Sequence, residues 1–237
     1  MPESQIKTGS RKLMFENAPK LFFVSFLFVA ISAIISSLTF LLPGTINLED
    51  IYSRLASGEM PSLSMIYLSF RPFGVVLAVL LYMIQPVIDA GFMSYCMKTH
   101  RTQNGEYKNV FDGFLYILKV LTIFIVSSIL IFLWSLLFFF PGISAYYRYR
   151  QAYYILLDDP KKSALQCIAE SKRIMRGKKL DLFILDLTFI GWYLLDIAVQ
   201  LLIPTPFALP IVSIWLSPYI GLSRVAFYEN QLINLAA

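Results

Sequence analysis

The chain of 237 residues is 57% hydrophobic and only 15% charged, with a formal net charge of +5 at pH 7. Ordinary soluble domains are roughly 45–50% apolar and about 25% charged, so this composition argues against a water-soluble fold. The apolar residues fall in long runs, and runs of about 18 or more predict transmembrane helices. Most basic residues lie between the runs, where they report membrane topology and attraction to anionic lipid rather than to nucleic acid.

Six apolar segments are predicted to cross the membrane, which gives an all-α, polytopic membrane helix bundle in a single domain. Their approximate ranges are 21–42, 73–97, 114–140, 143–157, 180–203 and 208–228. The first run is about 22 residues long, longer than the core of a signal peptide, and no cleavage site follows it, so we expect it to remain in the mature protein. Residues 45–71 mix apolar and charged types, as a surface helix or loop does.

The fourth segment, 143–157, is the least obvious because it contains Arg148 and Arg150. The lysines and arginines of the connections decide its course: four precede the first run, two follow it, three lie in residues 98–113 and seven in residues 158–179. If the segment crosses, fourteen of these lie on one side and two on the other; if it turns back, the division is seven against nine. The positive-inside rule therefore predicts that it crosses and that both termini are cytoplasmic.

Residues 160–176 have the punctuation of one amphipathic cytoplasmic helix. Asp159 is expected as the N-cap, Pro160 at the first helical position and Gly177 just past the end. Lysines and arginines flank its apolar face, so we expect the helix to lie on the membrane surface against lipid. The basic residues expected there are Lys161, Lys162, Lys172, Arg173, Arg176, Lys178 and Lys179.

Charged residues inside the predicted spans form the candidate site, since a charge in hydrocarbon costs several kcal/mol unless it is paired or wetted. The set is Asp89, Arg148, Arg150, Asp186 and Asp196. Counted from the cytoplasmic ends at about 1.5 Å per residue, Arg150 and Asp89 lie roughly 12 Å deep and Asp186 roughly 9 Å. We therefore predict an ion-pair cluster of these three, with Asp196 in the outer half and within reach of Arg148.

An aromatic face is expected beside Arg150. On a helix this arginine shares its side with Tyr146, Tyr147, Tyr153 and Tyr154. Two interpretations of the charges and tyrosines stay open. They lock helix packing, or they line a polar cavity that binds an anionic head group or moves a proton or ion.

The sequence gives little support for an enzymatic function. The single histidine, His100, lies in an expected cytoplasmic loop, where we expect it to be solvated rather than to act as a catalytic base. The His-Glu-x-x-His motif of a zinc protease needs two histidines, which this chain does not have. An intramembrane aspartyl enzyme needs two facing carboxylates, for which Asp89 and Asp186 are the only reasonable candidates, but a neighbouring arginine favours ionised carboxylates rather than a shared proton. We expect no enzyme activity, no metal and no cofactor.

A longer pattern runs through the second half of the chain. It consists of Pro141-Gly142-Ile143, a tyrosine-rich stretch from Tyr149 to Asp159-Pro160, Ser171-Lys172 with Gly177, Leu185-Asp186-Leu187 through Gly191-Trp192, Pro218-Tyr219 and Phe227-Tyr228. This pattern resembles a bacterial integral-membrane family known as domain of unknown function 975. That family is distantly similar to the membrane portion attached to some glycerophosphodiester phosphodiesterases. The resemblance implies a lipid-side setting without catalysis.

The sequence thus predicts a multi-pass protein of the bacterial cytoplasmic membrane. The leading interpretation is a non-enzymatic protein that engages anionic lipids, another membrane protein or a second copy of itself. The alternative is a small transporter or permease component with an intramembrane cavity lined by arginine and aspartate. Nucleic acid is not expected as a partner.

Overall fold

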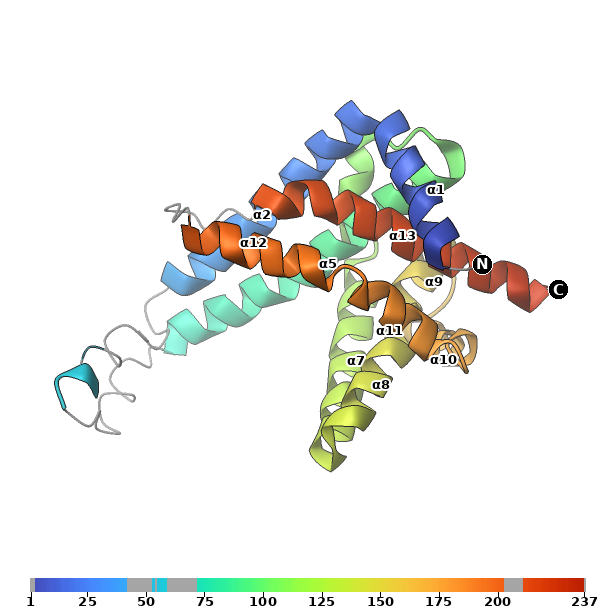
Figure 1. Cartoon of the computed structure of the whole chain (residues 1–237). Helices are drawn as coiled ribbons and strands as arrows, with labels where there is room; N and C mark the ends of the chain where they lie inside the picture. Colours follow the sequence, from blue (N-terminus) through green and yellow to red (C-terminus); the bar gives the residue numbers. More distant parts are fainter. Residues whose placement is uncertain (1–2, 42–52, 54, 59–71, 203–210, 237) are drawn as a thin grey trace.

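The fold is described from a computed structural model covering residues 3–41, 53, 55–58, 72–202 and 211–236. Every regular element in this part of the chain is helical (Figure 1). In chain order these elements are α1 (Glu3–Glu16), α2 (Ala18–Leu41), α5 (Pro72–Thr102), the 3-10 helix η1 (Tyr107–Phe111), α6 (Asp112–Leu115), α7 (Ile117–Leu137), α8 (Phe139–Tyr149), α9 (Ala152–Asp158), α10 (Ala164–Ile174), α11 (Lys179–Leu187), α12 (Ile190–Leu202) and α13 (Ile211–Ala236). The prediction for residues 45–71 lies almost wholly outside this range.

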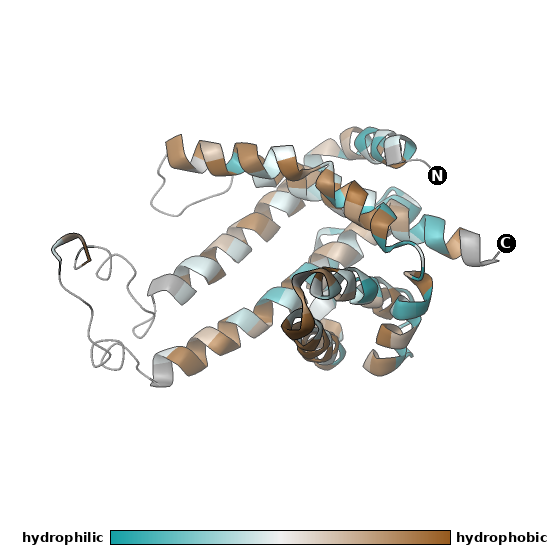
Figure 2. Cartoon of the chain, turned by 60° about the horizontal axis from the view of Figure 1, so that its bottom comes forward, coloured by the Kyte–Doolittle hydropathy of each residue, from teal (hydrophilic) through white to brown (hydrophobic). Residues whose placement is uncertain are grey.

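Long apolar helices dominate the molecule. Four helical stretches in the described residues are long and apolar enough to cross a membrane, namely Ala18–Thr39, Gly74–Thr102, Ile117–Leu137 and Lys179–Val199. Their apolar side chains are exposed to an unusual degree, and Phe140, Leu201 and Leu202 are about 80% exposed. Figure 2 shows hydrophobic residues around the long helices and hydrophilic ones near the two termini. This surface suits contact with lipid better than contact with water.

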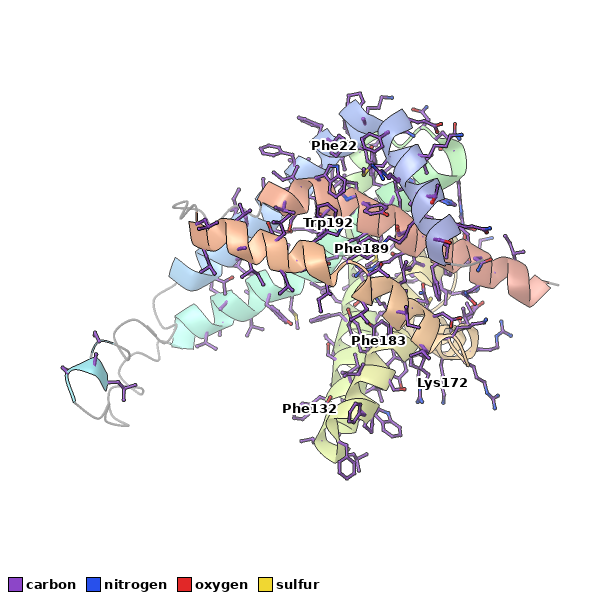
Figure 3. The ribbon with its side chains drawn as sticks, viewed as in Figure 1. Phe22, Phe132, Lys172, Phe183, Phe189 and Trp192 are labelled. Carbon is purple, nitrogen blue, oxygen red and sulfur yellow. The ribbon has the colours of Figure 1, made fainter. Side chains whose placement is uncertain are left out.

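Two arms diverge from a common centre. The first contains α2, α5, α12 and the first part of α13, and the second is the hairpin of α7 and α8 (Figure 1). Phe132 lies toward the free end of this hairpin arm (Figure 3). The all-α fold is confirmed, and its helices are arranged in two diverging arms.

The hairpin shows how the predicted fourth segment, residues 143–157, runs relative to α7. Gly142 packs against Ser135, while the amine of Lys119, in the first turn of α7, donates to the backbone carbonyl of Pro160 at 2.5 Å. The chain from Phe139 to Asp158 thus runs back along the whole of α7, and at about 1.5 Å per residue it rises roughly 30 Å. This is longer than predicted, because the chain turns at the extended residue Phe138 and not at Pro141-Gly142.

Proline does not stop the helix here. Pro141 lies in the first turn of α8, where the missing amide hydrogen has no intrahelical partner to lose. The interruption comes later, where Arg150 and Gln151 separate α8 from α9. A second interruption, at Thr188 and Phe189, divides the predicted span 180–203 into α11 and α12.

The connection after α5 packs back against that helix. A Cβ added to Gly91 would lie 1.7 Å from the backbone oxygen of Val110, and one added to Gly113 would lie 1.9 Å from the backbone oxygen of Val87. Both contacts are possible only because glycine has no side chain. Residues 107–115 therefore pack against α5 through Asn109, Val110 and Gly113, which are buried, rather than forming a free loop.

One end of the molecule is tied together by charges. Arg101 near the end of α5 donates to Asp158 at 2.6 Å and to Glu229 at 2.7 Å, and Asp158 also accepts from the hydroxyl of Tyr228. The ends of α5 and α9 and the later part of α13 therefore meet. Helix α1, which the sequence analysis did not anticipate, packs along α13 with Ile6, Leu13 and Met14 buried.

Helix α10 begins later than predicted. Ser163 is the N-cap, and it exchanges hydrogen bonds with Gln166 in a capping box. Asp159 instead ends α9, and its carboxylate accepts from the backbone N–H of Lys161 in a turn. Gly177 follows the helix with a φ of +79°, the left-handed conformation that glycine adopts readily.

Candidate functional site

A cavity of about 590 Å³ lies where the two arms meet. Residues from α2, α5, α7, α8, α9, α12 and α13 line it, together with Arg150 from the junction of α8 and α9. Its polar lining consists of Tyr82, Gln85, Asp89, Ser127, Ser128, Tyr146, Tyr149, Arg150, Tyr153, Tyr154, Tyr193, Ser213, Ser217 and Arg224. Phenylalanines and aliphatic side chains complete the wall. A polar site inside an apolar molecule is the usual form of a binding pocket.

The main electrostatic feature is a triad in which Arg150 and Arg224 share the carboxylate of Asp186. We call the two arginines the arginine pair. Arg150 Nη1 lies 2.9 Å from Asp186 Oδ2, and Arg224 Nε lies 3.1 Å from Asp186 Oδ1. The hydroxyl of Tyr147 also donates to Oδ2, at 3.2 Å. The three ionic side chains are between 12% and 21% exposed, so water screens them little.

The helix interruptions bring this triad together. Arg150 occupies the break between α8 and α9, and Asp186 lies in the last turn of α11, just before the break at Phe189. The buried Phe189 ring packs edge-on against Tyr219, 5.2 Å away, with the amine of Lys7 5.0 Å from its centroid. Packing of this one ring holds the end of α11 against α13, so Asp186 can reach Arg224.

Asp89 lines the same cavity without joining the triad. Its Oδ1 accepts from Gln85 Nε2 at 2.9 Å, and the same nitrogen lies 3.1 Å from Ser32 Oγ. Of the expected cluster of Arg150, Asp89 and Asp186, Arg150 and Asp186 are directly paired, while Asp89 shares with Arg150 only the lining of the cavity. No ion pair joins Asp89 to any cation in the described part of the chain.

Arg148 and Asp196 make different contacts from those expected. The guanidinium of Arg148 lies over the Trp134 ring, 5.6 Å from its centroid. Asp196 accepts from the hydroxyl of Ser213 at 2.8 Å and from the backbone N–H of Val212 at 3.2 Å. A carboxylate at the start of α13 satisfies an amide there and favours the positive end of the helix dipole. Within the described residues, no ion pair joins Asp196 to Arg148, and Asp196 instead holds the start of α13.

The tyrosines divide between the cavity and the packing. Tyr146, Tyr153 and Tyr154 line the cavity, and the Tyr146 ring carries the guanidinium of Arg150 at 5.0 Å. Tyr147 points instead to Asp186 and to Phe183, the latter labelled in Figure 3. Tyr154 stacks on Tyr228. The sequence analysis missed the other three lining tyrosines, which come from α5, α8 and α12.

Arg224 is the main residue that the sequence analysis missed. It lies in the stretch Leu222-Ser223-Arg224-Val225, inside the predicted span 208–228. The argument that selected Arg150, a charge within an apolar run, applies equally to Arg224. The signal was therefore present in the sequence.

The basic residues around α10 are only partly available to a ligand. Lys162 and Arg173 pair with Glu170, Lys178 lies 3.5 Å from Asp181, and Lys179 donates to Ser144. The hydrogen bond from Lys162 to Glu170 raises the pKa of this lysine. Lys161, Lys172 and Arg176 are exposed, and Figure 3 shows Lys172 extending away from the helix. The apolar side of α10 packs against α7, α8, α9 and α13.

Potential metal ligands are not clustered in the described part of the protein. Within the described residues, no three of histidine, cysteine, aspartate and glutamate are gathered where they could hold a metal ion. The arrangement can do something simpler. A guanidinium has five N–H donors, and the recorded ion pairs use Nη1 of Arg150 and Nε of Arg224, which leaves donors of both arginines for a negatively charged oxygen.

Comparison with known proteins agrees with the pattern of residues that forms this site. Residues 140–234 match the family described as "Protein of unknown function (DUF975)". The matched segment begins in α8, ends in α13 and contains Arg150, Asp186 and Arg224. Asp89 and Gln85 lie outside it. No curated protein and no solved structure matches the chain.

Proposed function

We propose that the protein is a multi-pass protein of the bacterial cytoplasmic membrane that binds an anionic head group in the cavity between its two arms. Six helical passes, with α8 and α9 together forming the fourth and both termini cytoplasmic, accommodate the positive-inside distribution of lysine and arginine. The four long apolar helices and the exposed apolar surface support this setting. The resemblance to the membrane portion attached to glycerophosphodiester phosphodiesterases favours a lipid-side role without catalysis.

One observation carries the proposal. Two guanidiniums on the cavity wall share a single carboxylate, so the triad holds one more positive than negative charge in a poorly hydrated place. Such an excess is costly unless a further negative charge neutralises it, either the Asp89 carboxylate in the same cavity or a bound anion. Arginine forks match the oxygens of phosphate and carboxylate, and the surrounding tyrosines provide both hydroxyls and apolar ring faces. An anionic lipid or amphiphile supplies the matching chemistry.

A binding titration tests the proposal. We expect the purified full-length protein in a non-ionic detergent to bind short-chain phosphatidylglycerol, and not the zwitterionic phosphatidylcholine of equal chain length. Arg150→Gln and Arg224→Gln each remove a charged donor, and we expect each to weaken binding by about ten- to hundredfold, the equivalent of about 1.5–3 kcal/mol. Isothermal titration calorimetry measures the change.

Two comparisons make the test specific. Glycerophosphoglycerol, the same head group without acyl chains, distinguishes a lipid site from a site for a free phosphodiester. Arg173→Gln is the matched control, because this arginine is 72% exposed on α10. Unchanged binding in both cavity variants, with a loss in the Arg173 variant, would contradict the cavity and favour the basic surface of α10.

Transport is the second candidate function, and the interrupted helices favour it. The α8–α9 break contributes Arg150 to the cavity wall, and the α11–α12 break lies between Asp186 and the lining residue Tyr193. Pro86 and Pro218 lie within the two long helices α5 and α13, which also line the cavity. Interrupted helices of this kind surround substrate sites in many transporters. Release of a trapped anionic amphiphile from proteoliposomes, stopped by Arg150→Gln, is the result expected of a transporter. A protein that only binds would show no flux.

A further inference from the structure

The cavity contains a carboxylate that the triad does not use. Asp89 lies on the α5 wall, three residues after Pro86, and its recorded hydrogen bond is to Gln85. The triad itself holds two positive charges and one negative charge. Asp89 therefore balances the remaining charge of the arginine pair across the cavity when no ligand is bound.

Polar and charged groups from several elements line the cavity together with Asp89. Across the cavity these are Arg150 and Arg224, with further polar groups from α2, α7, α8, α9 and α12: Ser32, Ser127, Tyr146, Tyr153 and Tyr193. Helices η1 and α6 pack on the Gly91 side of α5, and their acids, Glu106 and Asp112, are paired with Lys108 and Lys98. Among the described lining residues, Asp89 is thus the one carboxylic acid.

An incoming anion changes the charge balance. If an anionic oxygen binds to the arginine pair, the cavity holds the ligand charge, Asp186 and Asp89 against only two guanidiniums. An excess negative charge in a poorly hydrated site costs several kcal/mol. Protonation of Asp89 removes this excess, whereas Asp186 is held ionised by two arginines and by Tyr147.

We propose that Asp89 takes up a proton when an anion enters the cavity, so that the site binds one anionic group together with one proton. This inference rests on the proposed anion site. Protonation of Asp89 then makes the affinity of the cavity for the anion depend on pH. By linkage, the proton strengthens anion binding by the same factor by which the anion strengthens proton binding.

The neighbours of Asp89 suit both protonation states. With the carboxylate ionised, the Gln85 amide donates to Asp89 and approaches Ser32, as the structure has it. With Asp89 protonated, rotation of the amide presents its oxygen to the acid O–H, and the Ser32 hydroxyl becomes a second donor to it. The Asp89–Gln85–Ser32 chain can therefore keep its hydrogen bonds through the change.

The test measures proton uptake directly. Short-chain phosphatidylglycerol is a suitable probe, because its phosphodiester keeps a single charge between about pH 5 and pH 8. Calorimetric titration in two buffers of different ionisation enthalpy counts the protons taken up per ligand. For the parent protein we expect an uptake approaching one proton at the alkaline end, and a Kd that rises by up to about tenfold per pH unit there.

Three variants assign the proton. In Asp89→Asn we expect no proton uptake and a Kd that stays near the acidic parent value at every pH. In Asp89→Glu, which keeps an acid, the pH dependence should return. Asp181→Asn changes a half-exposed carboxylate outside the cavity lining and should behave as the parent does.

The outcomes separate the two proposals. Binding by the parent without proton uptake overturns the role of Asp89 and leaves the anion site standing, and this result needs no variant to fold. Persistent uptake in Asp89→Asn overturns it as well. If the parent binds no phosphatidylglycerol at any pH, the anion site and its proton linkage fail together.

Discussion

Replacing Asp186 with alanine is expected to destabilise the protein more than truncation of any charged side chain that lines the cavity. Asp186 is the shared partner of Arg150 and Arg224, and its side chain is only 13% exposed. Its loss leaves two partly buried guanidiniums without their counter-ion, and removing one partner of a fully buried ion pair costs about 3–5 kcal/mol, which is the upper limit here. Heating in detergent followed by size-exclusion chromatography should show a clearly lower melting temperature.

Two variants serve as controls for this measurement. Asp186→Asn keeps the shape of the side chain and some hydrogen bonding, so it should fall between alanine and the parent. Asp181→Ala removes a carboxylate that is half exposed and 3.5 Å from Lys178, an interaction of at most about 1 kcal/mol. If Asp186→Ala has the same melting temperature as the parent protein, the triad does not hold α11 to α9 and α13.

Replacing Gly91 with alanine should produce the second large loss of stability. The new Cβ would lie 1.7 Å from the backbone oxygen of Val110, and a backbone atom cannot rotate out of the way as a flexible side chain can. Overpacking of this kind costs typically about 1–3 kcal/mol, so η1 must separate from α5 or the whole protein must lose stability. The same thermal assay measures the effect.

Gly191 provides the matched control. A Cβ at this position of α12 meets no atom within 4 Å, so Gly191→Ala should leave the melting temperature unchanged or raise it slightly. Equal behaviour of the two variants would mean that residues 107–115 do not pack closely on α5.

Hydrophobicity alone was enough to predict helices in the long apolar runs, because backbone groups in hydrocarbon must bond within the helix. Counting depth from the span ends was enough to bring Arg150 and Asp186 together. The same procedure placed Asp89 in the cavity but gave it the wrong partner. Depth specifies the level of a residue and not the direction of its side chain, and only the packed structure shows Gln85 between Asp89 and Ser32.

Other structural features depend on tertiary contacts that cannot be predicted from local sequence patterns. The break between α11 and α12 has neither glycine nor proline at Thr188 and Phe189, and it follows from the burial of Phe189 against Tyr219. Helix α1 is mostly polar, and most of its few apolar residues become buried only because the helix packs on α13. The start of α10 was misplaced because Asp159-Pro160 is also a good turn, and the capping box of Ser163 and Gln166 decides between them.

The proposed position of Arg150 inside the bilayer requires α8 and α9 to carry the chain back across it, and the side of the membrane on which Ser163 lies tests this most directly. Single cysteines are introduced at Thr8, Ser57 and Ser163 after Cys96 and Cys167 are replaced with serine, and cells are treated with a membrane-impermeant maleimide. We expect labelling of position 57 in intact cells, and of positions 8 and 163 only after permeabilisation. Labelling of position 163 in intact cells, with position 8 still protected, would contradict the six-pass arrangement and the intramembrane site.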